Sequence, residues 1–332
     1  MSSKPDLLEL ANEIVLGKRL SKNDDLRFFI DCDLDALTRG ADYIRRRLIG
    51  NRVDLCSVVN ARSGRCSENC KYCAQSVYSS AKCEVYPLLS QDKLIAACKI
   101  NETEGVDRFS LVTSGRALCG EEFERAVLAF QALRKECDVK LCASMGFLTT
   151  NQLRRLRESG VTTYHHNIET SPSYFSKICT THSIEDKLAT FERVKAAGLR
   201  LCSGGIVGLG ESWEDRIEMA ATLAEHEVDS IPINELIPIR GTALENLPRL
   251  TEPGILRIIA IFRYLNPTSS IRLAAGRALM SRDGERAFES GADATITGNM
   301  LTTVACATIR SDRAMLRALG REIKEAPGDA QP

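Results

Sequence analysis

The chain has 332 residues, of which 44% are hydrophobic, so it is long enough to bury a large core in one or two domains. Its 44 basic and 44 acidic side chains cancel, which argues against the strongly basic surface that binds nucleic acid or anionic membranes non-specifically. The charged N-terminus lacks the apolar core of a signal peptide, and no run of about 18 apolar residues occurs. We therefore expect a cytoplasmic protein with no nucleic-acid or membrane partner.

In chain order, the first predicted elements are helices within residues 1–50. A single barrel domain is then expected over residues 51–320, and a tail over residues 321–332. Within the barrel, short apolar runs alternate with longer amphipathic segments. The predicted strands are 55–60, 108–113, 139–144, 162–169, 199–205, 229–236, 269–275 and 292–297. The main helices predicted between them are 121–136, 150–160, 184–198, 212–226 and 254–265.

Strands that alternate with helices predict parallel βαβ units. Eight such units fit a closed (β/α)8 TIM-type barrel with an N-terminal helical extension better than an open sheet. An incomplete six-stranded barrel with terminal extensions is the alternative. In a TIM-type barrel the active site lies at the carboxyl ends of the strands. The segment RSGRCSENCKYCAQS (62–76) follows the first predicted strand, so we place it at the catalytic mouth.

This segment holds three cysteines, Cys66, Cys70 and Cys73, in the spacing C-x3-C-x2-C. The chain has 13 cysteines and no secretion signal, which favours metal ligation over a disulfide framework. Structural zinc prefers four protein ligands, whereas a [4Fe–4S] cluster held by three cysteines keeps one open iron position. Both metals stay open on spacing alone. The isolated cysteines are interpreted as small buried hydrophobes: Cys32, Cys56, Cys98, Cys119 and Cys137.

The C-x3-C-x2-C spacing, with Tyr72 before its last cysteine, resembles the cluster loop of the radical S-adenosylmethionine (SAM) enzymes. Several segments together resemble the biotin synthase family: NARSGRCSENCKYCAQS, YHHNIETSPSYF, TTHSIEDKL, LCSGGIVGLGES, IPINELIPIRGT and SSIRLAAGR. They run in order from about residue 50 to about residue 303. The resemblance implies that dethiobiotin is converted to biotin. The 5′-deoxyadenosyl radical from SAM would break two C–H bonds, and an auxiliary iron–sulfur cluster would supply the sulfur.

The same resemblance implies residues for cofactor and substrate. SAM and its cluster loop would involve Tyr72, Asn167, Glu169, Lys187, Gly205 and Ile206, while dethiobiotin would contact His165 and Asn234. Strand alternation independently predicts that His165, Asn167 and Glu169 share one face. The family often has Asn at the position of His165 and Asp at the position of Glu169. For Lys187 a solvated helix position is the alternative, and for the glycines a tight turn.

By resemblance, the auxiliary cluster is a [2Fe–2S] cluster held by three cysteines and an arginine, and Cys142, Cys202 and Arg272 match three of these positions. The fourth position is Ser110, a poor iron ligand beside thiolates. Either a [2Fe–2S] cluster survives with oxygen ligation, or a rebuilt cluster of the [4Fe–4S] type recruits Cys179. Cys83 and Cys306 are further spare thiols.

The resemblance also implies partners: a reducing electron donor such as flavodoxin or ferredoxin, iron–sulfur assembly proteins, and a second copy in a homodimer. Because the cluster gives up its sulfur, turnover is expected to stall after about one event per chain without cluster repair. Two alternatives remain. One is another radical SAM enzyme, which rearranges amino acids or matures hydrogenase. The other is a non-catalytic iron–sulfur or zinc protein.

Overall fold

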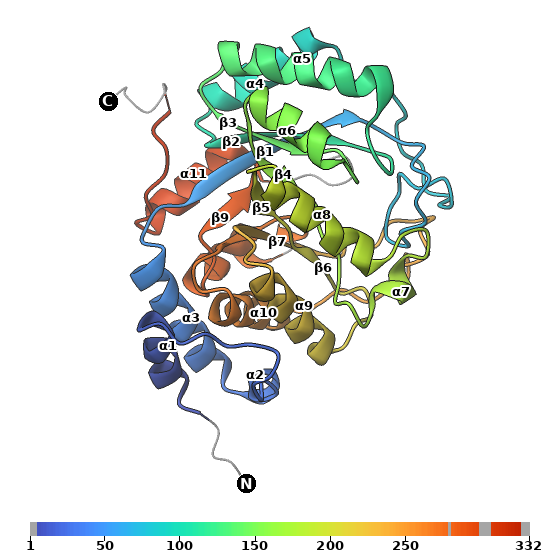
Figure 1. Ribbon diagram of the computed structural model, residues 1–332. Coiled ribbons are helices and arrows are strands. Elements are labelled where there is room, and N and C mark those ends of the chain that lie inside the picture. The colour runs from blue at the N-terminus through green and yellow to red at the C-terminus, as the bar shows by residue number, and fades with distance from the viewer. Residues whose placement is uncertain (1–4, 278–279, 299–306, 327–332) are drawn as a thin grey trace.

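The computed structural model describes residues 5–277, 280–298 and 307–326, and its strands form one parallel sheet (Figure 1). Each of the eight predicted strands is present. The strands are β1 (Asp54–Arg62), β2 (Arg108–Thr113), β3 (Lys140–Ser144), β4 (Val161–His165), β5 (Arg200–Cys202), β6 (Gly205–Val207), β7 (Ser230–Glu235), β8 (Ser270–Leu273) and β9 (Ala294–Ile296).

The sheet closes on itself, because β1 pairs with both β2 and β9 while β7 pairs with β5, β6 and β8. The short strands β5 and β6 occupy one position of the ring, interrupted at Ser203 and Gly204. A Cβ on Gly204 would lie 2.0 Å from the Pro232 carbonyl oxygen. Glycine is therefore required where the segment between β5 and β6 approaches the backbone of β7. The fold is therefore the predicted (β/α)8 barrel, and the six-stranded alternative is wrong.

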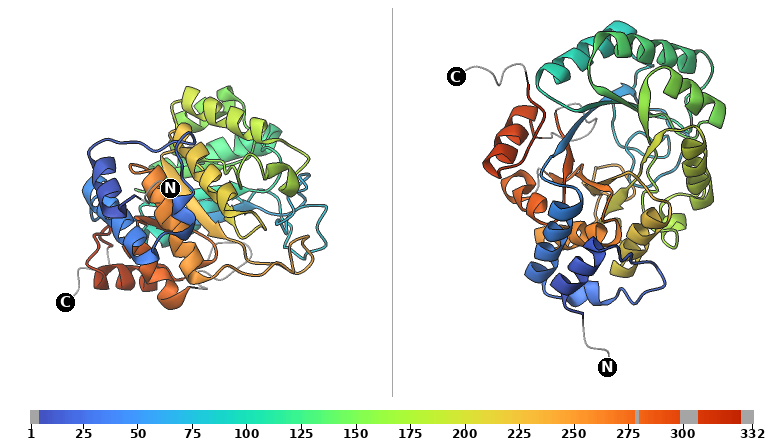
Figure 2. Two further views of the ribbon diagram at one scale, coloured as in Figure 1. Left: turned by 90° about the horizontal axis from the view of Figure 1, so that it is seen from below. Right: turned by 60° about the vertical axis from the view of Figure 1, so that its left-hand side comes forward.

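Helices surround this ring, as the right-hand view of Figure 2 shows. They are α4 (Gln91–Thr103), α5 (Gly120–Glu136), α6 (Thr150–Glu158), α7 (Phe175–Ile178), α8 (Ile184–Ala196), α9 (Trp213–Glu225), α10 (Glu252–Leu265) and α11 (Ile309–Ala318), with the 3-10 helix η2 (Ser281–Glu289). The N-termini of α6, α8 and α9 are fixed by capping boxes that start at Thr149, Ser183 and Ser212.

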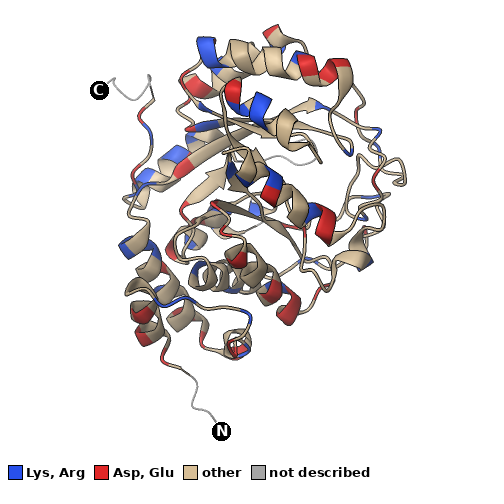
Figure 3. Cartoon of the chain, viewed as in Figure 1, with Lys and Arg blue, Asp and Glu red and all other residues tan. Residues whose placement is uncertain are grey.

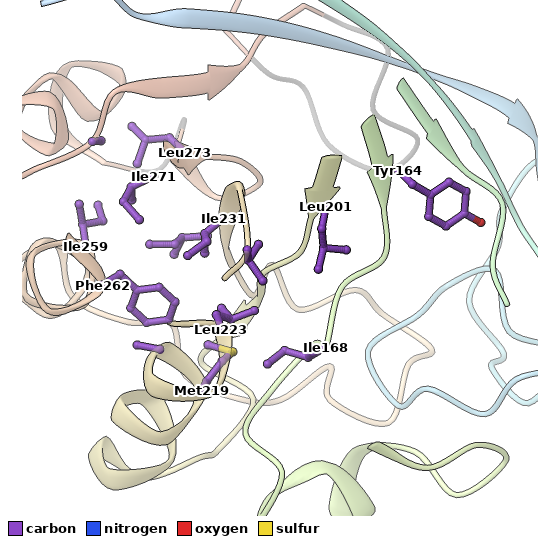
Figure 4. Packing of buried hydrophobic residues seen from close by; sticks show 14 of the residues in the cluster. Tyr164, Ile168, Leu201, Met219, Leu223, Ile231, Ile259, Phe262, Ile271 and Leu273 are labelled. Atoms are coloured by element: carbon purple, nitrogen blue, oxygen red, sulfur yellow. The ribbon is translucent and has the colours of Figure 1, made fainter. Parts of the chain in front are cut away.

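The hydrophobic core lies between the strands and these helices. Figure 4 shows Ile259 and Phe262 of α10 beside Ile231 of β7 and Ile271 of β8. All four side chains are buried. Apolar residues thus point outward from the strands to the helices, which leaves the inward positions free for polar and sulfur-bearing side chains.

The predicted N-terminal helices are α1 (Leu7–Val15), α2 (Phe28–Asp31) and α3 (Leu34–Leu48), and α3 packs against α10. At the other end, residues 321–326 lie against the barrel: the Glu322 carbonyl accepts a hydrogen bond from the Val53 N–H at 2.8 Å, and Arg321 is buried. The predicted tail therefore does not begin at residue 321. None of the described helices is long and apolar enough to cross a membrane.

Acidic and basic residues are interspersed along the outer helices (Figure 3). This distribution agrees with the zero formal net charge of the sequence.

Candidate active site

A cavity of about 740 Å³ occupies the inside of the barrel. Every strand contributes to its wall, and along β1, β2 and β3 the contributing residues alternate, for example Asp54, Cys56 and Val58. Alternation sends every second side chain of a strand inward. The cavity therefore runs along the barrel axis from the floor, where the strands begin, to the mouth, where they end.

At the mouth, Cys66, Cys70 and Cys73 all line this cavity. Backbone hydrogen bonds curl their loop: the Cys66 N–H donates to the Gln75 carbonyl at 2.9 Å, and the Cys73 N–H donates to the Cys70 carbonyl at 3.0 Å. Burial raises the pKa of Cys73 to about 11, so without a metal this thiol stays protonated at neutral pH. A soft metal centre would replace its proton. Cys83, which follows the loop in the sequence, does not line the cavity. Of the described cysteines, the mouth therefore offers a cluster the three thiols of Cys66, Cys70 and Cys73.

Beside this loop lie the residues expected to contact SAM. Tyr72, Asn167, Glu169, Lys187 and Ile206 all line the cavity. Lys187 is buried, with its Nζ atom 3.9 Å from Glu169 Oε1 and 5.4 Å from the centre of the Phe147 ring. The alternative of a solvated helix lysine is therefore wrong.

Glu169 has a left-handed backbone, with φ 72°, and its carbonyl accepts a hydrogen bond from the Ile206 N–H at 2.7 Å. Gly205 is not part of the cavity wall, unlike its neighbour Ile206. A Cβ on Gly205 would lie 2.5 Å from the Glu169 carbonyl oxygen and 2.5 Å from Met219 Sδ. Gly205 thus lets two backbone segments approach each other closely, and its expected contact with SAM stays a prediction.

Towards the floor, a second group of sulfur atoms faces the cavity: Cys56 of β1, Cys142 of β3 and Cys202 of β5. Burial is the main cause that raises the pKa of each thiol, to about 11 for Cys202, and each thiol feels the charge of Arg272. Cys142 is also close enough to Cys56 and Cys202 to raise the pKa of both. The structure therefore brings together the predicted Cys142, Cys202 and Arg272.

Cys56 is the residue that the sequence prediction missed. It was interpreted as a small core hydrophobe, but its thiol faces the same space as Cys142 and Cys202. Ser110 of β2 lines the same cavity, so the second strand does supply an oxygen where the family has sulfur. The first strand supplies a thiol in its place. Because both faces of β1 are largely buried, alternation along the sequence does not by itself show that Cys56 points into the cavity.

The guanidinium of Arg272 is held by several acceptors on the floor. Its Nη2 atom is 2.5 Å from Asp54 Oδ1, and its Nη1 atom donates to the carbonyls of Thr295 at 2.9 Å and Asp54 at 3.1 Å. Arg108 Nε also donates to Asp54, at 2.9 Å from Oδ2. Burial alone would raise the pKa of Asp54, but the two guanidinium groups outweigh it and lower that pKa. Arg272 is thus fixed beside the thiols by a buried ion network.

The two residues expected to contact the substrate lie between mouth and floor. His165 Nδ1 is 3.3 Å from Cys202 Sγ, and burial together with Lys187 and Arg272 lowers the pKa of His165 to about 4. Its imidazole is therefore neutral at physiological pH. The Asn234 amide donates to the Gly205 carbonyl at 3.1 Å and accepts from the Ala275 N–H at 3.2 Å, and its side chain remains part of the cavity wall.

Cys179 does not join the floor group. Its Sγ atom lies 3.8 Å from Cys70 Sγ, behind the mouth loop, and Cys179 is not part of the cavity wall. The structure therefore does not bring Cys179 to Cys142 and Cys202, whereas it does bring Cys56 there. Cys306 lies outside the described residues.

Two family models match the chain: the radical SAM superfamily over residues 61–223, and the biotin and thiamin synthesis associated domain over residues 232–322. Among curated proteins, a biotin synthase of Clostridium beijerinckii is 52% identical over 95% of this chain and 99% of its own length. A biotin synthase of Alkaliphilus metalliredigens is 49% identical over the same shares.

Solved structures of lower identity share the fold. A methylornithine synthase aligns with a TM-score of 0.81 at 20% identity, covering 96% of this chain and 98% of its own. A maturase of the [FeFe]-hydrogenase aligns with a TM-score of 0.81 at 16% identity, covering 96% of this chain and 75% of its own. These two structures support the barrel and carry no argument about the substrate.

Proposed function

The chain belongs to the biotin synthase family of radical SAM enzymes. We propose that it converts dethiobiotin to biotin, and that two groups of cysteine thiols inside its barrel hold the clusters for this reaction. The observation that carries this proposal is the single cavity that both groups line. Three cysteines face its mouth, three more face its floor, and polar side chains lie between them. A substrate in that space would have a source of radicals on one side and a source of sulfur on the other.

At the mouth, Cys66, Cys70 and Cys73 would hold the [4Fe–4S] cluster that binds SAM. Three soft thiols suit iron–sulfur ligation and leave one iron open to the amino and carboxylate groups of SAM. When bound and reduced, this cluster supplies the electron that splits SAM and produces the hydrogen-abstracting radical. The closed barrel wall keeps water away from the reacting atoms and fixes the substrate beside them.

Glu169 and Lys187 would orient SAM above the substrate. The Glu169 carboxylate has acceptor oxygens for ribose hydroxyls, and the Lys187 ammonium group is a point charge for the SAM carboxylate. Glu169 Oε1 and Lys187 Nζ lie 3.9 Å apart, so the two side chains form an ion pair beside the proposed position of the cofactor. Tyr72 and Ile206 complete the wall around this position.

At the floor, Cys56, Cys142 and Cys202 would hold the auxiliary cluster, with Arg272 beside them. Cys56 and Cys142 are buried, Cys202 is half-buried, and the three thiols interact with one another, as a shared cluster requires. When bound, this cluster supplies the sulfur that bridges the two carbons of dethiobiotin. Its iron content, two or four, is left to measurement.

His165 and Asn234 would fix the substrate between the two clusters. A neutral imidazole at this depth adds no charge beside an uncharged ureido ring. An amide such as Asn234 can both donate to a urea and accept from it. In the substrate-free chain that amide is satisfied by backbone groups of β6 and the segment after β8, so the substrate would have to share or displace these hydrogen bonds.

An external reductant of the flavodoxin or ferredoxin type would deliver the electron. The homodimer, the iron–sulfur assembly partners and the cytoplasmic location stay predictions.

The test is anaerobic incubation of the reconstituted protein with SAM, dethiobiotin and a strong reductant. We expect biotin and 5′-deoxyadenosine as products, and neither product from the Cys70→Ala variant. Exposed Cys119 provides the matched control, because Cys119→Ala changes a thiol that faces solvent. Cleavage of SAM without any biotin would contradict the proposed substrate, and would favour another radical SAM reaction.

A further inference from the structure

One thiol beside the mouth has no place in the mechanism above. Cys179 follows α7, is buried, and lies 3.8 Å from Cys70 Sγ, measured between the two sulfur atoms. Cys70 faces the cavity, whereas Cys179 belongs to the hydrophobic core behind it. Cys179 is thus in contact with a cluster ligand from the side opposite to SAM and the substrate.

A dense set of hydrogen bonds fixes this contact by joining the mouth loop to the segment after α7. The Lys71 N–H donates to the Ile178 carbonyl at 3.0 Å. The Asn69 side-chain oxygen accepts from the Thr180 N–H at 2.9 Å and the Thr181 N–H at 3.2 Å. These bonds flank Cys179 on both sides, so they hold its backbone beside the mouth loop and keep its thiol within reach of Cys70.

Polar groups surround the Cys179 sulfur on its other side. His182 Nδ1 lies 3.4 Å from Cys179 Sγ and 2.5 Å from Glu68 Oε2. Glu68 belongs to the mouth loop itself, and Thr181 and Arg116 also hydrogen-bond to its carboxylate. The chain thus builds a polar shell around one buried thiol, which a purely apolar packing role would not require.

The direction of the Cys70–Cys179 hydrogen bond depends on iron. Without iron, Cys70 donates to Cys179. Iron ligation removes the Cys70 proton, so the contact is then a hydrogen bond only if Cys179 donates. The competing acceptors are the Asn69 side-chain oxygen, 3.2 Å from Cys179 Sγ, and the Thr181 hydroxyl oxygen at 3.5 Å. Both are neutral, and the Asn69 oxygen already accepts from backbone N–H groups, whereas the Cys70 thiolate is anionic and therefore the stronger acceptor.

We propose that Cys179 is a positioning residue that donates a hydrogen bond to the iron-bound Cys70 thiolate and thereby raises the reduction potential of the SAM-binding cluster. Hydrogen bonds to cluster sulfur stabilise the reduced, more negative state, and they are one of the factors that set cluster potentials. The consequence is an easier transfer of the first electron to the cluster. This inference rests on the proposed function, because it requires that Cys70 hold the cluster.

The experiment compares Cys179→Ala and Cys179→Ser with the unchanged protein and with the control Cys119→Ala. Each reconstituted protein is titrated electrochemically under anaerobic conditions, and the reduced SAM-binding cluster is followed by electron paramagnetic resonance. Its signal is identified by the change that added SAM produces. We expect a full iron content in all four proteins, a more negative midpoint potential in Cys179→Ala, and partial or full recovery in Cys179→Ser, whose hydroxyl still donates.

A potential in Cys179→Ala equal to that of the control would overturn the proposal. Loss of iron from both Cys179 variants would also overturn it, because Cys179 would then be a ligand. The ligand atoms of Cys70, Cys179 and His182 lie within 4.8 Å of one another, so a metal held by these three is the specific alternative. The His182→Gln variant distinguishes the hydrogen-bonding role from the ligand role. If His182 only hydrogen-bonds to Cys179, the variant keeps its iron and its midpoint potential shifts less than that of Cys179→Ala. If His182 is a ligand, the variant loses iron. Absence of SAM cleavage in the unchanged protein would instead count against the proposed function.

Discussion

Replacement of Cys56 by alanine tests whether the first strand supplies a ligand to the auxiliary cluster. The informative background is the Cys66/Cys70/Cys73→Ala triple variant, in which iron can remain only at the floor. In that background we expect about two to four irons per chain, according to the cluster type. Adding Cys56→Ala should reduce this content to nearly zero, because the floor would retain only two thiols, Cys142 and Cys202.

The size of the packing defect shows why unfolding would not explain such a loss. Cys56 is 7% exposed, and removal of one buried sulfur atom costs about 1 kcal/mol of folding free energy. A domain is typically stable by about 5–15 kcal/mol, so the variant should remain folded. Cys98 of α4 is 0% exposed and lies outside the barrel cavity, so Cys98→Ala is the matched control for loss of a buried thiol.

Anaerobic iron and sulfide analysis with Mössbauer spectroscopy measures the result. The reasoning predicts iron loss for Cys56→Ala, and no loss for Cys98→Ala or Cys179→Ala in the same background. Retention of the full iron content without Cys56 would refute the assignment. If Cys179→Ala loses the iron in this background, Cys179 is a ligand of the auxiliary cluster, as the sequence predicts.

Three further predictions concern the cavity wall. Glu169→Gln should weaken SAM binding about 10- to 100-fold, as expected for a lost hydrogen bond to a charged group, with unchanged iron content by chemical analysis. Arg272→Met should lower the free energy of unfolding in urea by about 3 kcal/mol, because the partly buried Asp54 carboxylate would keep only Arg108 as its cationic partner, and Asp54→Asn should recover part of this loss. The pKa of His165 is lowered from 6.5 in the unfolded chain to about 4 in the folded chain. Between these two values the histidine is protonated in the unfolded chain and neutral in the folded one, so the folding free energy becomes less favourable as the pH falls below 6.5. His165→Gln should therefore reduce the stability difference between pH 7 and pH 5 by about 2 kcal/mol in the cluster-free chain, and equal pH dependence in both proteins would contradict this.

The barrel could be predicted from the sequence because its strands are short apolar runs separated by amphipathic helices. The interruption between β5 and β6 could not, since it depends on how closely Gly204 approaches Pro232. The mouth cysteines could also be predicted, because their ligand spacing is local in the chain.

Cys56 and Cys179 show the limit of sequence reasoning about this site. Both faces of β1 are largely buried, so apolar character alone does not tell which residues point into the cavity and which into the outer core. Cys179 lies in a loop, and its position depends on hydrogen bonds with Asn69, more than 100 residues away in the chain. Neither placement could be derived from local periodicity.

The most direct test of the account is to follow the sulfur atom itself. The auxiliary cluster is rebuilt with isotope-labelled sulfide, excess sulfide is removed, and one turnover is run anaerobically with SAM, dethiobiotin and reductant. Mass spectrometry of the product should show labelled sulfur in biotin, at about one molecule per chain before activity stalls. Unlabelled biotin, or sustained formation of biotin without a supply of iron and sulfide, would show that the sulfur does not come from the floor of the barrel.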